Sequence, residues 1–305
     1  MRVALLAATV GLAAGAAGYA VCALVASLLA RSAARRGSSA ALAVRLLPAV
    51  GALLAALALA VPAFVINEPE FSYERPGMVA ALLASAGLVL AGSLARRALD
   101  AWRATRRVLD EWERSAQPFG MRSVPAPAFR IAHSFPVVAV VGVIKPRLFV
   151  ARSVLHALTP DELQAVLEHE AAHVRARDNA KRWLMACAPS LGWRRTAQGL
   201  ERAWENAAEH EADRSAHGAL DLASALVKTA RMAPHGAHLR IPVAAFHGGG
   251  DVARRVQDLV AGAPGTRTGR ATFRAALLAA AALVAAAPLF WPIAYGWAEA
   301  LIRLP

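Results

Sequence analysis

The sequence predicts a mainly α-helical, polytopic membrane protein with about four transmembrane helices and a cytoplasmic α+β domain inserted between the third and the fourth. Hydrophobic residues make up 57% of the 305 positions, above the roughly 45–50% usual in soluble domains. Four apolar stretches carry no charge, and each approaches or exceeds the length of about 20 residues that crosses a bilayer. They cover residues 3–30, 46–66, 78–95 and 275–298. We therefore expect three transmembrane helices in residues 1–95, a domain in 96–270, and the fourth helix with a short external tail in 271–305.

Two of these stretches have alternative interpretations. Met1, Arg2 and the many small residues after them would suit a cleaved signal peptide. The apolar run is longer than the roughly 7–15 residues of such a peptide, which favours a retained helix. Residues 78–95 form the shortest stretch and could be a buried helix of a soluble domain. The arginines after it favour a membrane span.

Charged residues between the stretches predict the orientation. The segments after the first and third stretches are rich in arginine, whereas the segment after the second is rich in glutamate. The arginines are Arg31, Arg35, Arg36, Arg45, then Arg96, Arg97, Arg103, Arg106 and Arg107; the glutamates are Glu68, Glu70 and Glu74, beside Arg75. Because lysine and arginine are enriched on the cytoplasmic side, we expect the N-terminus outside and residues 96–270 in the cytoplasm. Trp291, Tyr295 and Trp297 suit the outer interface.

The net charge of +13 does not require a nucleic-acid partner. Many of the arginines flank membrane stretches, where they can contact anionic lipid headgroups. No aromatic and basic interleaving typical of nucleic-acid binding is present. The two cysteines, Cys22 and Cys187, lie in apolar surroundings, so neither a disulfide framework nor a cysteine-rich metal site is expected. The expected partners are the lipid bilayer and a protein substrate.

The predicted cytoplasmic domain begins with an amphipathic helix at residues 98–114. Residues 121–150 then contain prolines and β-branched runs, which predict a sheet of two or three strands. One strand could hold an extended peptide at its edge or form an ordinary core hairpin. Residues 183–193 are apolar but too short to span a membrane, and could dip into the interface or end a buried helix at Pro189.

The C-terminal part of this domain contains two further helical segments, through Met232 and at residues 253–259, which we expect to pack on the preceding helices. Between them, residues 234–250 are rich in histidine, glycine and proline. His235, His238 and His247 are irregularly spaced there, which predicts a loop rather than a metal site. Residues 262–269 are interpreted as a linker into the last span.

The segment His169-Glu170-Ala171-Ala172-His173 contains the residues that indicate a metal site. On a helix, residues four apart share one face, so both imidazoles can reach one zinc ion beside a carboxylate. Thr159, Pro160 and Glu162 predict the start of that helix through a capping box. The pattern is short, and in an alanine-rich helix it also occurs as solvated charges with a stray histidine.

A second helical stretch, residues 205–213, supplies further ligands. Glu209 and Asp213 are again one turn apart. One carboxylate could bind the metal while the other orients a ligand histidine. Together the two segments predict a metal site shared by two helices.

These motifs resemble the integral-membrane zinc metallopeptidases of the BlaR/MecR type and, more distantly, the HtpX and CAAX prenyl protease group. The resemblance rests on His169-Glu170-x-x-His173 and Glu209-x-x-Ala212-Asp213 and extends from about Phe135 to Arg214, with a weaker echo from Arg254 to Leu259. It implies a zincin-like metallopeptidase domain. In proteins of this kind, a strand borders the active-site cleft.

The resemblance also implies the roles of the site residues. One Zn²⁺ per chain would be held by His169, His173 and Glu209, with Glu170 as the general base of peptide hydrolysis. Asp213 would orient a ligand histidine, and Asp178 is a further candidate for this task. Glu205 and Glu211 are lower-ranked ligands. His210, Arg214 and His217 are candidates for stabilising the oxyanion only through their proximity in sequence.

The expected function is thus a membrane-embedded zinc endopeptidase acting on a cytoplasmic or membrane-associated protein, with a repressor in a signalling pathway as one candidate. Antibiotic-sensing relatives carry a penicillin-binding domain after the last span, whereas this sequence ends at Pro305, which predicts a protease without that sensor. The alternatives are a non-proteolytic signalling scaffold with a structural zinc site and a transporter or channel subunit. The spans lack the charged residues expected along an ion path.

Overall fold

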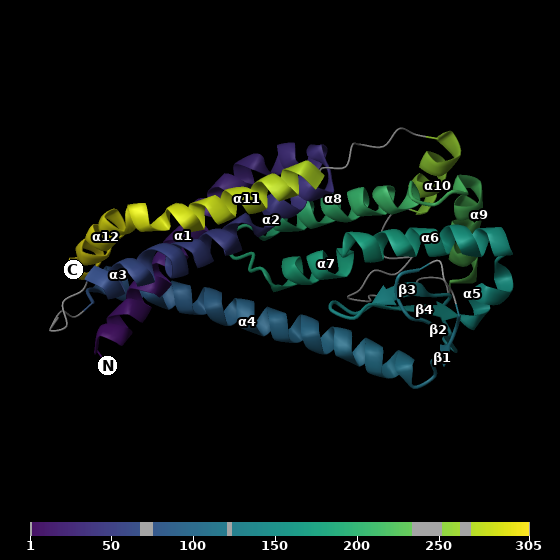
Figure 1. Cartoon of the computed structure of the whole chain (residues 1–305), viewed down its shortest axis with the longest axis horizontal. Coiled ribbons are helices and arrows are strands. Elements are labelled where there is room, and N and C mark those ends of the chain that lie inside the picture. The colour runs from purple at the N-terminus through teal and green to yellow at the C-terminus, as the bar shows by residue number, and fades with distance from the viewer. Residues whose placement is uncertain (1, 68–75, 121–123, 234–251, 263–269, 305) are drawn as a thin grey trace. The chain divides into compact units, whose positions relative to one another are not determined.

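The computed structural model describes residues 2–67, 76–120, 124–233, 252–262 and 270–304 (Figure 1). The chain divides into two compact units. Unit 1 comprises Met1–Arg97, Cys187–Arg202 and Gly269–Pro305, and unit 2 comprises Ala98–Ala186 and Ala203–Thr268. The expected loop with His235, His238 and His247 lies outside the described residues, as does the linker after Gly262. The domain boundaries at residues 96 and 270 stay predictions.

The structure is mainly helical, and four helices are long and apolar enough to cross a membrane, as the sequence predicts. These candidate spans are Val3–Arg36, Ser38–Asn67, Met78–Glu113 and Leu278–Arg303. The helical elements that contribute to them are α1 (Arg2–Arg36), α2 (Ser38–Leu53), η1 (Leu54–Ala60), α3 (Val61–Asn67), α4 (Met78–Glu113), α11 (Arg270–Ala286), η2 (Ala287–Phe290) and α12 (Trp291–Arg303). The third span and the expected amphipathic helix 98–114 form one continuous helix, α4.

Small residues let the helices of unit 1 approach closely, as is common between membrane helices. A Cβ on Gly18 would lie 2.7 Å from the side chain of Ala55, and a Cβ on Gly87 would collide with the backbone of Leu12. Only glycine fits at these positions, so the backbones of α1, η1 and α4 meet there.

Arg45 is buried in unit 1 rather than exposed in a loop. Helix α1 ends at Arg36 and α2 begins at Ser38, so the arginine-rich segment after the first span is itself helical. The Arg45 side chain donates to Glu201 Oε1 at 2.6 Å and to the Ala188 carbonyl at 3.0 Å. Its 1% exposure requires such partners, because a buried charge without them is costly.

Unit 2 contains a four-stranded sheet in the order β1-β2-β4-β3. The strands are β1 (Gln117–Pro118), β2 (Ala128–Ile131), β3 (Val138–Val141) and β4 (Arg147–Ala151). Strands β2 and β4 are parallel, whereas β1 with β2 and β3 with β4 are antiparallel. Three of these strands, β2, β3 and β4, lie in the region predicted to hold two or three, which confirms that prediction; the fourth, the two-residue strand β1, precedes it. Gly142 ends β3 with a φ of 108°, which glycine adopts readily.

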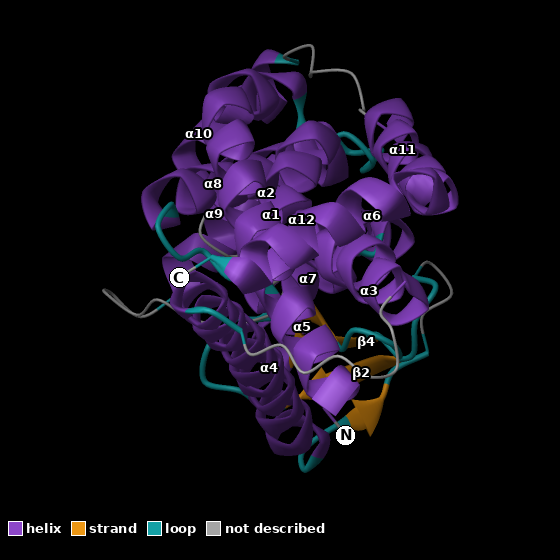
Figure 2. Cartoon of the chain, turned by 90° about the vertical axis from the view of Figure 1, so that its left-hand side faces the viewer, coloured by secondary structure: helices purple, strands orange, loops and turns teal. Residues whose placement is uncertain are grey.

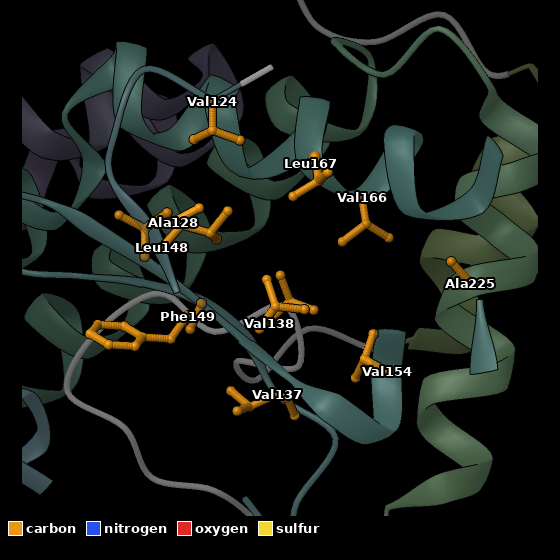
Figure 3. Packing of buried hydrophobic residues seen from close by; sticks show 14 of the residues in the cluster. Val124, Ala128, Val137, Val138, Leu148, Phe149, Val154, Val166, Leu167 and Ala225 are labelled. Atoms are coloured by element: carbon orange, nitrogen blue, oxygen red, sulfur yellow. The ribbon is translucent and has the colours of Figure 1, made fainter. Parts of the chain in front are cut away.

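Among the described residues, unit 2 further contains residues 98–113 of α4 and six shorter helices; helices and strands are coloured apart in Figure 2. The six helices are α5 (Arg152–Ala157), α6 (Pro160–Ala176), α7 (Asp178–Cys187), α8 (Arg194–Asp213), α9 (Ala219–Met232) and α10 (Val252–Ala261), of which α8 begins in unit 1. The core joins the sheet to α6 and α9: Val138 and Phe149 belong to one hydrophobic cluster with Val166, Leu167 and Ala225 (Figure 3). Helix α7 stops at Cys187, before Pro189, as one of the two interpretations of residues 183–193 expected.

Helix α6 is fixed at its start by the predicted capping box. Thr159 Oγ1 accepts from the Glu162 backbone N–H, and the Thr159 backbone N–H donates to Glu162 Oε2 at 2.8 Å. Glu162 is also reached from α9, by Ser224 Oγ at 2.6 Å and Lys228 Nζ at 2.7–2.8 Å. Burial opposes ionisation of Glu162, but the bonds from Lys228 and Ser224 outweigh it and lower its pKa to about 2.

We expect Glu162→Gln to destabilise unit 2 by about 1.5–3 kcal/mol at neutral pH, the usual range for hydrogen bonds to a charged group. Because the folded pKa lies below the ordinary value of 4.5, the stabilisation is present above that pH and is lost as the pH falls toward about 2. Thermal unfolding in detergent between pH 7 and pH 3 measures both effects. Asp161→Asn, an exposed neighbour in the same helical turn, is the control. A pH-independent difference from the wild type would contradict the assignment.

Candidate metal centre

Helix α6 presents both histidines of the first motif on its buried face. His169 and His173 are 0% and 4% exposed, and their Nε2 atoms lie 3.2 Å apart. The two rings meet edge to face with centroids 4.8 Å apart. The i, i+4 spacing thus brings two imidazole nitrogens together within one helical turn.

Helix α8 brings Glu209 to the same point. Its Oε2 lies 3.5 Å from His169 Nε2, and its Oε1 lies 3.6 Å from His173 Nε2. Donor atoms bound to zinc at about 2.0–2.2 Å in tetrahedral geometry are separated from one another by about 3.3–3.6 Å. One donor atom from each of the three residues lies within 4.8 Å of the others. The arrangement therefore fits a single ion, and the carboxylate and imidazoles are ligands that zinc accepts.

Each histidine ring is oriented by a second carboxylate. His173 donates from Nδ1 to Asp178 Oδ2 at 2.8 Å, and His169 Nδ1 lies 3.0 Å from Asp213 Oδ1. Burial opposes ionisation of Asp178, but the His173 bond and nearby charge hold its pKa below the ordinary value. Because a carboxylate accepts hydrogen bonds, the His173 proton is held at Nδ1, and the Asp213 carboxylate beside His169 Nδ1 favours the same tautomer there. Both Nε2 atoms are then available to a metal.

Two arginines contact Glu209, and the sequence analysis gave neither a role. Arg255 on α10 is 5% exposed and places Nη1 3.1 Å from Glu209 Oε2. It also donates to both oxygens of Asp213, at 2.9 and 2.5 Å. Arg182 on α7 lies 3.5 Å from Glu209 Oε1, with its guanidinium over the Trp204 ring. Burial alone would raise the pKa of Glu209, but the hydrogen bond from His169 and the charges of His173 and Arg255 lower it.

Glu170 is buried beside the two histidines and is 1% exposed. Its Oε2 has no hydrogen-bond partner within the described part of the chain. Burial is the main cause that raises its pKa to about 8; the charges of His173 and Glu209 act in opposite directions. An unsatisfied carboxylate oxygen in a buried position is costly, so a ligand beside it, such as an ion with its water, fits this site.

The lower-ranked candidates make other contacts. Glu205 pairs with Arg182 at 3.5 Å. His210 bonds Asp258 at 2.9 Å, and Arg214 Nε donates to the His210 carbonyl at 3.2 Å. The His217 side chain is 91% exposed and contacts Glu168. None of these contacts involves the cluster of His169, His173 and Glu209.

A buried group of two histidines and a glutamate, with carboxylates behind the imidazoles, defines a metallopeptidase type of site in a chain with four candidate membrane spans. Residues 78–195 match the family model described as BlaR1 peptidase M56. This match confirms the predicted resemblance to the BlaR/MecR membrane metallopeptidases. It includes all of α6 and ends before Glu209. No curated protein matches the chain.

The family match also indicates the general function of the chain. It implies metallopeptidase activity, a metal and a protein substrate. Together with the four apolar helices, it indicates a multi-pass membrane protein in a lipid bilayer.

We expect Arg255→Gln to weaken metal binding about 10–100-fold, the loss usual when a partner behind a metal ligand is removed. The reason is that Arg255 holds both Glu209 and Asp213. Competition for Zn²⁺ with a chromogenic chelator measures the affinity without reference to activity. Arg254→Gln is the control, because Arg254 is adjacent on α10 but 63% exposed. Unchanged Zn²⁺ affinity in a folded Arg255→Gln protein would show that the contacts of Arg255 with Glu209 and Asp213 are not needed for metal binding.

Proposed function

We propose that this protein is a membrane-embedded zinc endopeptidase with one Zn²⁺ per chain, held by His169, His173 and Glu209. The observation that carries the proposal is that the two Nε2 atoms lie 3.2 Å apart, and that one Glu209 oxygen lies 3.5 Å from His169 Nε2 while the other lies 3.6 Å from His173 Nε2. One donor atom from each of the three residues lies within 4.8 Å of the others, so the three side chains can share one ion. Catalytic zinc sites typically use three protein ligands of this kind and leave the fourth position to water or substrate.

Zinc held by these three side chains would supply Lewis acidity, which polarises a carbonyl and makes water a better nucleophile. In this proposal, Glu170 accepts the water proton and passes it to the leaving amine. Asp213 and Asp178 keep His169 and His173 in the tautomer that presents Nε2. Arg255 holds the Glu209 carboxylate through Oε2.

The alternative, a scaffold with a structural zinc site, is less well supported by the geometry. Structural zinc sites are usually closed by four protein ligands and need no general base. Among the described residues, the potential metal group consists of three residues, and the adjacent Glu170 has an oxygen without a partner. Both features favour catalysis.

The substrate class in this proposal is a cytoplasmic or membrane-associated protein, with a signalling repressor as one candidate. Strand β3 is an edge of the sheet, so an extended peptide could pair with it. Asn179 Nδ2 donates to the Val140 carbonyl at 2.8 Å and to the Gly142 carbonyl at 3.1 Å. Peptide pairing along the whole of β3 would therefore have to displace Asn179.

We expect Glu170→Gln to retain zinc but lose at least about 100-fold in peptide hydrolysis, the low end of the contribution of a general base. Zinc content by mass spectrometry and newly formed N-termini in cells, compared with the wild type, measure the two properties. Glu168→Gln is the matched control: Glu168 lies on the same helix and contacts His217 instead. Retained zinc with unchanged proteolysis would remove Glu170 as the base.

The proposed orientation places the N-terminus outside and residues 96–270 in the cytoplasm, following the positive-inside distribution of arginine. In a background with Cys22→Ala and Cys187→Ala, we expect Ser72→Cys to react with a membrane-impermeant maleimide on intact cells. His217→Cys, at an exposed position, should react only after permeabilisation. The reverse labelling pattern would refute this orientation.

A further inference from the structure

Unit 2 contains a cavity far in sequence from the metal centre. It has a volume of about 220 Å³ and is lined by residues 102–113 of α4 and by residues 142–147 of the β3–β4 turn. The contributing positions of α4, 102, 105, 106, 109 and 113, follow the i, i+3/i+4 spacing of one helical face. The site described above uses none of these residues.

The cavity combines exposed apolar side chains with cations. Ile144 is 78% exposed and Trp102 is 42% exposed, and both line the opening with Leu109. Large apolar side chains grouped in this way on a surface mark a binding or membrane-contact site.

The charge of the lining is positive, with three cations against one carboxylate. Arg147 pairs with Glu113, which leaves Arg106 and Lys145. Within the described ranges, neither of these two forms an ion pair; Arg106 instead stacks over Trp102 at 5.7 Å. The lining therefore suits a ligand with one anionic group and an apolar part.

The position of the cavity along α4 indicates the source of such a ligand. The charge-free part of this span ends at Ala95, and Trp102 follows seven residues later on the same unbroken helix. At about 1.5 Å per residue, Trp102 lies about 10 Å along the helix from the apolar part. This distance is comparable to the depth of the headgroup region, where tryptophan and basic residues are enriched.

We propose that this cavity binds one anionic phospholipid. The lipid phosphate lies between Arg106 and Lys145, and the start of an acyl chain contacts Trp102, Leu109 and Ile144. This site does not depend on the proposed peptidase activity. Failure of one proposal therefore leaves the other intact.

The test is lipid binding by the full-length protein in detergent, measured by native mass spectrometry with phosphatidylglycerol and with phosphatidylcholine of identical chains. We expect the first phosphatidylglycerol to bind at least about tenfold more tightly than phosphatidylcholine. Each basic residue near an anionic headgroup contributes about fivefold in affinity. Arg106→Gln combined with Lys145→Gln should thus lower phosphatidylglycerol affinity about 25-fold, and each single variant about fivefold.

The matched control is Arg103→Gln combined with Arg107→Gln. It removes the same charge from α4 at positions that do not line the cavity, and should change the affinity less than twofold. Ile144→Gln should weaken both lipids, because it removes an apolar contact. Unchanged thermal unfolding and zinc content show that the variants are folded.

Three outcomes would overturn the proposal. Equal affinity for the two lipids would exclude headgroup selection. If the control with Arg103→Gln and Arg107→Gln lost as much phosphatidylglycerol affinity, the lipid would be attracted by positive charge in general and not by a defined site. Displacement of phosphatidylglycerol by millimolar inorganic phosphate would show an anion site that does not use the acyl chain.

Discussion

The meeting of α6 and α8 at one point is the interaction on which the metal centre depends. The two Nε2 atoms of α6 are brought together by helical spacing alone. The carboxylate of Glu209 has to arrive from a helix that begins 21 residues after His173, at 3.5 and 3.6 Å from these nitrogens. A relative shift of the helices by one residue, about 1.5 Å of rise, would be enough to lose the tetrahedral spacing. The fold of unit 2 therefore has to fix this register.

The register between α6 and α8 is fixed by contacts among several buried charged side chains. Burying such charges is unfavourable unless they are paired. Glu209 and Asp213 share Arg255, and Asp178 pairs with Lys181 as well as with His173. Asp213 and Asp178 thus each contact a cation as well as a histidine. Glu170 differs, since among the described residues it forms no ion pair, its Oε2 has no hydrogen-bond partner, and burial raises its pKa. Glu170 is also the residue proposed to exchange protons with water and substrate. A buried group with a shifted pKa is typical of such functional positions.

Sequence reasoning anticipated the parts of this structure that depend on local periodicity. The four spans, the capping box of α6 and the pairing of His169 with His173 follow from spacing within one helix. The role of Arg255 could not be found in this way, because its partner Asp213 lies 42 residues earlier and the weak family resemblance from Arg254 to Leu259 assigns it no partner. Strand β1 has only two residues and exists through its pairing with β2. The burial of Arg45 depends on Glu201, 156 residues away, so its sequence suggested an exposed cytoplasmic charge.

The end of α6 shows how a local backbone feature completes the site. Arg177 adopts a left-handed conformation with a φ of 55°, which costs a residue with a side chain about 1–2 kcal/mol. Its backbone N–H approaches the carbonyls of His173 and Val174, which offsets part of that cost. The helix therefore stops at once, and α7 begins at Asp178, close enough for its carboxylate to reach His173 Nδ1 at 2.8 Å. If α6 continued, residue 178 would lie five positions along the same helix, rotated about 140° away from His173. The unfavourable conformation at Arg177 is thus what allows a neighbour in sequence to orient the second histidine.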